Sequence, residues 1–98
     1  MKTREEYIDR LTTELKAWSA EIDVLHAKAE IAADDVKLKY QQEIEALRVK
    51  ERAAAEKIKE LQASTGDAWE TVKETAEQVW HDLRTGLAGV VDKFKSAD

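Results

Sequence analysis

Apolar side chains recur with a seven-residue period over the first third of the chain. Nine successive a and d positions of one heptad are apolar: Ile8, Leu11, Leu15, Trp18, Ile22, Leu25, Ala29, Ala32 and Val36. The segment is rich in alanine, leucine, glutamate and lysine, which lose little conformational freedom in a helix. The heptad therefore predicts an amphipathic helix whose apolar stripe packs along another helix.

The phase of this heptad shifts after Val36. Continuing the first phase would bury charged side chains, among them Lys39, Glu43, Lys50 and Lys57. A phase displaced by one four-residue step has Glu51 as its only charged member and otherwise contains Tyr40, Ile44, Leu47, Ala54, Ile58 and Leu61. Such an insertion unwinds a coiled coil only locally, and no glycine or proline lies between Thr3 and Ala63. We therefore expect one straight helix over residues 3–63.

The strongest stop signal in the chain is the segment Ser64-Thr65-Gly66-Asp67. Gly66 can adopt the left-handed conformation that ends a helix, and Asp67 can cap the next helix with Glu70 three residues later. Residues 64–67 are therefore expected to form a hairpin turn.

A second amphipathic helix is expected over residues 68–95. Its apolar positions fall within an arc of about 120° at 100° per residue. These positions are Trp69, Val72, Ala76, Val79, Trp80, Leu83, Leu87, Val90, Val91 and Phe94. Gly86 and Gly89 lie off this stripe, and each costs the helix about 1 kcal/mol relative to alanine. The last turns of this helix are therefore expected to be its least stable part.

Together these segments predict a single all-α domain over residues 1–98, in which a long helix and a shorter C-terminal helix form an antiparallel helical hairpin, a coiled coil. The shorter helix covers only the C-terminal half of the long one, so the stripe from Ile8 to Val36 needs another partner. An antiparallel homodimer would cover it by exchanging N-terminal halves between chains. The alternative is a monomeric three-helix bundle with a bend near residues 32–36. We favour the dimer, because those residues carry no turn signal beyond Asp34 and Asp35.

Composition excludes several protein classes. The 98 residues contain three glycines, no proline and no cysteine, which leaves too few turn formers for a β-sandwich or barrel. The missing cysteines exclude disulfide scaffolds and thiol enzymes. The helical pattern is therefore the only strong structural signal in the sequence.

Charge narrows the choice of partners. The chain has 16 lysine and arginine residues against 21 aspartate and glutamate residues, for a net charge of −5, and no basic block. Clustered positive charge is what neutralises phosphates, so nucleic acid is not an expected partner. There is no secretory or membrane-spanning apolar run, and a cytoplasmic location is expected.

Candidate metal and catalytic residues are few. His26 has Asp23 and Glu30 at helical spacing, and His81 has Glu77, but a helical di-metal site needs two Glu-x-x-His motifs and two further glutamates. In a bundle the two histidines would lie about 10 Å apart along the helix axis. No nucleophile motif or glycine-rich phosphate loop is present. The sequence therefore predicts no catalytic residue, no metal site and no cofactor; a metal-binding helical bundle is the least favoured of the functions weighed.

The aromatic residues of the second helix suggest an alternative function. Trp69, Trp80 and Phe94 lie on an amphipathic stripe with an 11-residue repeat, as in helices that bind lipid surfaces. The segment from Asp67 to Asp98 carries a net charge of −3, which repels anionic headgroups. A peripheral membrane or lipid-binding role is therefore kept as the alternative, and packing within the hairpin is preferred.

The sequence resembles a known family over nearly its whole length. The opening Lys2-Thr3-Arg4-Glu5-Glu6-Tyr7-Ile8 and the later Gly66-Asp67-Ala68-Trp69-Glu70, followed by Val79-Trp80 and Leu83, are similar to small bacterial coiled-coil proteins described as stress-responsive. The resemblance implies a helical cytoplasmic protein with a stress-linked role, and it transfers no functional residue.

The expected function is that of a non-enzymatic coiled-coil interaction or scaffolding protein, acting by self-association as a homodimer and on an unknown protein partner. Its expected functional residues are a helix-packing seam and the turn residues Gly66 and Asp67. The seam consists of Ile8, Leu11, Leu15, Trp18, Ile22, Leu25, Val36, Tyr40, Ile44, Leu47, Ile58, Leu61, Trp69, Val72, Val79, Trp80, Leu83, Leu87, Val90 and Phe94.

Overall fold

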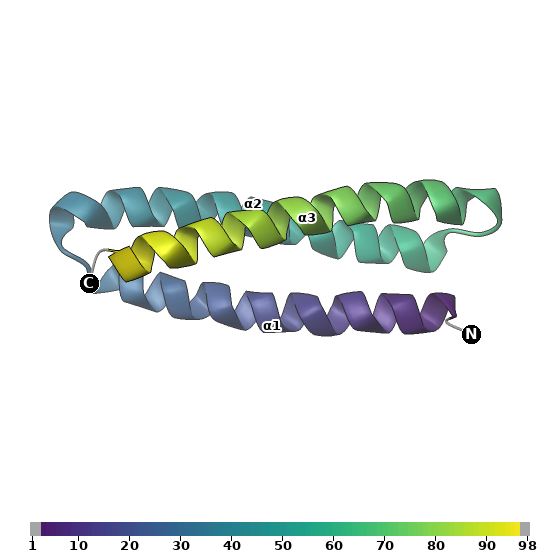
Figure 1. The fold of residues 1–98 in the computed structure, drawn as a ribbon, viewed down its shortest axis with the longest axis horizontal. Helices are drawn as coiled ribbons and strands as arrows, with labels where there is room; N and C mark the ends of the chain where they lie inside the picture. Colours follow the sequence, from purple (N-terminus) through teal and green to yellow (C-terminus); the bar gives the residue numbers. More distant parts are fainter. Residues whose placement is uncertain (1–2, 97–98) are drawn as a thin grey trace.

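The computed structural model, which describes residues 3–96, is a bundle of three helices (Figure 1). Helix α1 spans Arg4–Glu30, α2 spans Asp34–Ala63 and α3 spans Asp67–Ser96. Consecutive helices run antiparallel, so α1 and α3 run in the same direction. The bundle measures 51 × 20 × 17 Å, and α2 makes the main contacts with both other helices. The described residues contain no strand.

The prediction of one helix over residues 3–63 is wrong. The chain ends α1 at Glu30, turns through Ile31–Ala33 and starts α2 at Asp34, so it follows the arrangement of the monomeric three-helix bundle. No residue of this turn is a glycine or has positive φ, which is why it carries no sequence signal. The physical reason for the break is burial: folding α2 back on α1 covers the apolar stripe of α1 within one chain.

The helix ends at this break are closed by backbone bonds. The amides of Ile31 and Ala32 donate to the carbonyls of Lys28 and Ala29, and the amide of Lys37 donates to the carbonyl of Ala33 at 2.9 Å. Ala33 occupies the cap position of α2 and offers no side-chain acceptor. By contrast, the Thr3 hydroxyl caps α1 by accepting from the amide of Glu6 at 3.1 Å. The break is therefore maintained by packing of the helices more than by local capping.

The second turn lies where the sequence predicts it. Gly66 has a φ of 55°, in the left-handed region that glycine adopts without strain. Helix α3 begins at Asp67, one residue earlier than expected, so Asp67 lies in the first turn and not at the cap position. Its carboxylate and that of Glu70 lie where negative charge is favoured by the helix dipole.

The core runs along the whole bundle. It contains sixteen buried apolar residues: Leu11, Ile22, Leu25, Ala29, Tyr40, Ile44, Leu47, Ala54, Ile58, Leu61, Ala76, Trp80, Leu83, Leu87, Val90 and Phe94. Three aromatic pairs set the register of α3 against its neighbours, since large rings pack in only a few relative positions. Tyr7–Trp69 and Trp18–Trp80 join α3 to α1, and Tyr40–Phe94 joins α3 to α2.

The helix glycines of α3 differ in their surroundings. A Cβ at Gly86 would lie 3.3 Å from Cδ2 of Leu47 and 3.2 Å from Nζ of Lys50, so this glycine allows α2 and α3 to approach closely. This close approach is not visible in the sequence, where Gly86 lies off the apolar stripe. A Cβ at Gly89 would meet nothing within 4 Å. Gly89 is therefore a purely unfavourable choice within the helix.

We expect Gly89→Ala to raise the free energy of unfolding by about 0.5–1 kcal/mol, because alanine restricts the unfolded chain and enters open space. Gly66→Ala should lower it by about 1–2 kcal/mol, because alanine is strained at positive φ. Urea denaturation followed by circular dichroism measures both. Equal effects of the two substitutions would contradict this account of the glycines.

Candidate functional site

The predicted packing seam lies in the interior of the bundle. Every one of its residues is either in the buried core or packed against it, with Ile8, Leu15, Trp18, Val36, Trp69, Val72 and Val79 partly buried. The seam therefore joins helices of the same chain. A partner that binds the folded protein must use another surface.

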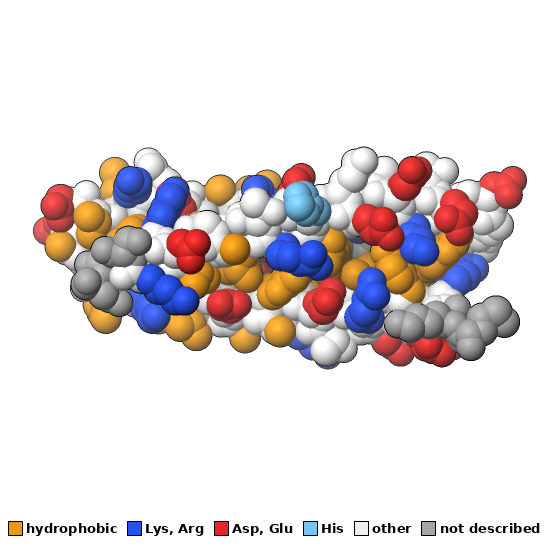
Figure 2. All heavy atoms as spheres, in the orientation of Figure 1, with side chains coloured by type: hydrophobic (Ala, Val, Ile, Leu, Met, Phe, Trp, Pro, Cys, Tyr) orange, Lys and Arg blue, Asp and Glu red, His pale blue; other side chains and the backbone are white. Residues whose placement is uncertain are grey.

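Such a surface is present on the outward side of α1. Ala17, Ala20, Val24, Ala27 and Ile31, at or just beyond its C-terminal half, are all exposed and follow each other at intervals of three and four residues. Val24 is 54% exposed and Ile31 is 87% exposed. Figure 2 shows hydrophobic side chains along the lower left edge of the molecule, over this part of α1. We refer to these five residues as the outer α1 stripe.

The spacing of the outer α1 stripe is that of a second heptad. Ala17, Val24 and Ile31 occupy its a positions, whereas Ala20 and Ala27 occupy its d positions. This stripe is hard to recognise in the sequence because the larger residues on the opposite side of the same helix dominate the hydrophobic pattern. The signal that reveals it is the presence of two apolar stripes on opposite sides of one helix, because a three-helix bundle covers only one side of each helix.

Charged residues flank the outer α1 stripe on both sides. Lys16 and Asp23 lie at g positions, and Glu21 and Lys28 lie at e positions. Within residues 3–96, Lys16, Glu21 and Lys28 form no ion pair at 4 Å or less. Their charges remain available to a second helix laid along the stripe.

The polar groups between α1 and α2 are engaged with each other. Nη2 of Arg48 lies 2.6 Å from Oδ1 of Asp23, and Nη1 lies 3.1 Å from Oε1 of Glu51. Glu51 also accepts a hydrogen bond from the Ser19 hydroxyl. The hydrogen bond to Asp23, followed by the one to Glu51, raises the pKa of the Arg48 guanidinium. This network provides hydrogen-bond partners for Glu51, the one charged residue of the second apolar phase.

The two histidines are both exposed and lie on different helices. Nε2 of His26 is 3.5 Å from Oε1 of Glu30, whereas His81 lines a surface groove with Glu77 and Arg84. Among residues 3–96, no group of three or more histidine and acidic side chains is placed to hold a metal ion.

The aromatic residues considered for lipid binding face the bundle. Trp80 and Phe94 are buried, Trp69 is partly buried, and the Trp80 indole donates to the carboxylate of Glu14 at 3.0 Å. Among the described residues, no helix has an apolar stretch of the length needed to span a bilayer. Lipid insertion by this stripe would therefore require α3 to leave the bundle.

Comparisons with family models, with curated proteins and with solved structures found no match to this chain.

Proposed function

We propose that this protein is a non-enzymatic helical interaction module that self-associates reversibly through the outer α1 stripe. The observation that supports this proposal is the second apolar heptad, which remains exposed after the three helices have covered their inward sides. Exposed apolar residues aligned along one helix face are typical of helix–helix interfaces. The stress-linked role implied by the family resemblance is part of the same proposal.

The occupant that fits the stripe best is a second copy of α1 running in the same direction. Val24 in α1 and Ile31 directly after it are β-branched residues at a positions, the side-chain type that parallel two-stranded coiled coils prefer there. In this register Lys16 faces the partner's Glu21, and Asp23 faces the partner's Lys28, so opposite charges meet on both flanks. Five mostly small side chains bury little area, and an interface of this size is typical of a transient complex.

The proposal predicts concentration-dependent dimerisation that a charge in the stripe abolishes. Sedimentation equilibrium should show a mass that rises from one chain towards two as the protein concentration increases. Val24→Glu should stay monomeric over the same range, because a buried unpaired carboxylate opposes association. Val49→Glu is the matched control: Val49 is 53% exposed on α2, outside the stripe, and its substitution should leave dimerisation unchanged.

The orientation is tested by exchanging charges. Lys16→Glu and Glu21→Lys should each weaken the dimer, whereas the double variant should restore it, because the two charges face each other across a parallel pair. A monomeric mass at all concentrations, or equal weakening by Val24→Glu and Val49→Glu, would overturn the proposed function.

A further inference from the structure

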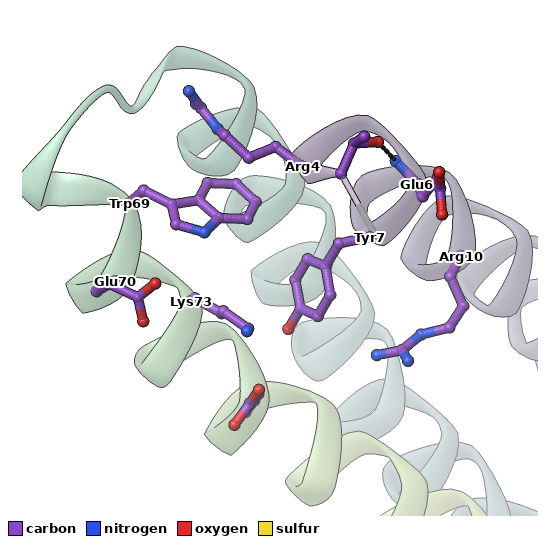
Figure 3. A pocket seen from close by; sticks show the side chains of 9 residues that line it. Arg4, Glu6, Tyr7, Arg10, Trp69, Glu70 and Lys73 are labelled. Carbon is purple, nitrogen blue, oxygen red and sulfur yellow. Dashed lines mark hydrogen bonds between the residues drawn. The ribbon is translucent and has the colours of Figure 1, made fainter. Parts of the chain in front are cut away.

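A second feature, independent of self-association, lies at the end of the bundle where α1 and α3 begin. Here a groove of about 650 Å³ is lined by Thr3, Arg4, Glu6, Tyr7, Arg10, Trp69, Glu70, Lys73 and Glu77 (Figure 3). Because α1 and α3 run in the same direction, the positive ends of both helix dipoles meet at this groove. The groove lies beside the first turns of α1 and α3, away from the outer α1 stripe in the C-terminal half of α1.

Two aromatic rings form the floor of the groove. The rings of Tyr7 and Trp69 meet edge to face, with their centroids 5.8 Å apart and their planes at 78°. Both side chains are only partly buried, so part of each ring is accessible from the groove. A planar apolar ligand can therefore contact aromatic carbon here without displacing core residues.

Three cations lie against these rings. Cζ of Arg4 is 4.7 Å from the Trp69 ring centroid, Cζ of Arg10 is 5.1 Å from that of Tyr7, and Nζ of Lys73 is 5.2 Å from the same Tyr7 ring. Within residues 3–96 none of the three forms an ion pair at 4 Å or less with a carboxylate. Arg4 also donates to the carbonyl of Ser64, whereas the donors of Arg10 and Lys73 remain available to an anion.

The Tyr7 hydroxyl lies between two of these cations. In Figure 3 Lys73 and Arg10 approach Tyr7 from opposite sides, one from α3 and one from α1. Burial, followed by the negative charge of Glu77, raises the pKa of Tyr7, so the phenol stays protonated at neutral pH and can donate a hydrogen bond. An anion at this edge of the ring would meet donors from both helices.

The acidic residues of the groove do not prevent an anion from binding to these cations. Glu6, Glu70 and Glu77 are exposed, and Glu6 and Glu70 lie in the first turns of α1 and α3, where the helix dipoles offset their charge. The carboxylates also select against large polyanions such as nucleic acid, because extended phosphate chains would approach them. Glu77 acts on Tyr7, where Arg10 and Lys73 place two positive charges against its one negative charge.

We propose that this groove binds a small aromatic phosphate, whose phosphoryl group contacts Arg10, Lys73 and the Tyr7 hydroxyl while its ring packs against Trp69. Arginine and lysine donors complement a dianion, and the exposed part of the Trp69 ring supplies the apolar contact. Arg4 holds Trp69 in place, since its guanidinium lies over the indole and donates to the carbonyl of Ser64 in the adjacent turn.

The test uses phenyl phosphate as the probe and follows the indole N–H resonance of Trp69 by NMR. Phenyl phosphate should shift this resonance saturably. Inorganic phosphate lacks the ring that packs against Trp69, and phenol lacks the phosphoryl group that accepts from Arg10 and Lys73. Each should therefore bind at least about tenfold more weakly. Equal affinities for inorganic phosphate and phenyl phosphate would contradict the proposed contact between the ring of the ligand and Trp69.

Variants separate the groove from general charge attraction. Arg10→Gln combined with Lys73→Gln should weaken phenyl phosphate binding at least about tenfold. Lys39→Gln combined with Lys95→Gln removes the same charge from exposed positions outside the groove and should leave binding unchanged. No saturable shift in the unsubstituted protein, or equal loss in both double variants, would overturn the proposal. Neither result would bear on self-association through the outer α1 stripe.

Discussion

A Leu83→Ala variant is expected to lose about 3–4 kcal/mol of its free energy of unfolding. The Leu83 side chain is 0% exposed and belongs to the central core of the bundle. Removing it takes away buried apolar surface and leaves a cavity that two long helices close only in part. Urea denaturation followed by far-UV circular dichroism measures the loss. The total free energy of unfolding of a domain of this size is about 5–15 kcal/mol, so the expected loss is a large fraction of it.

The matched control is the same substitution at an exposed leucine. Leu38 on α2 is 63% exposed, so Leu38→Ala should change the free energy of unfolding by less than about 0.5 kcal/mol. Similar losses at the two positions would contradict the packing of α3 described above.

Spin labels at Asp9→Cys and Gln62→Cys are expected to report a short distance between α1 and α2. The two positions line one surface groove, although 53 residues separate them in the chain. In the bundle the labels should lie within about 25 Å, because neighbouring helix axes are about 8–10 Å apart. A straight helix over residues 3–63 would separate them by about 80 Å, at 1.5 Å per residue. Pulsed electron–electron double resonance distinguishes these values without removing any native cysteine, since the chain has none.

Dilution of the labelled protein with unlabelled protein distinguishes a monomeric bundle from a dimer in which two chains exchange their N-terminal halves. The short distance should persist at high dilution if both labels belong to one chain. Its disappearance would show that α1 packs on the α2 of another chain, and the break at residues 31–33 would then not hold in solution.

The outer α1 stripe and the groove beside Tyr7 and Trp69 could not be predicted from the sequence, for two different reasons. The stripe is local, so its heptad spacing is visible in residues 17–31. Alanine, however, is common on both buried and exposed faces of helices, so the sequence does not show whether this face is buried or exposed. The groove combines residues from the N-terminal turns of α1 and α3, about 60 positions apart in the chain. Only the parallel course of those two helices brings the cations of α1 beside Lys73 and Trp69.

The sequence by itself determined the all-α class, the inward stripe of each helix and the turn at Gly66, because helical periodicity and the left-handed preference of glycine act locally. Only the tertiary structure decided that the first sixty residues form two helices. Residues 31–33 contain nothing that favours a turn over a helix. The sequence therefore shows the free-energy cost of breaking the helix there, but not the free energy gained when the two halves pack together. The gain comes from covering Leu11, Ile22 and Leu25 with α2 and α3, and burial of that kind depends on contacts between distant residues.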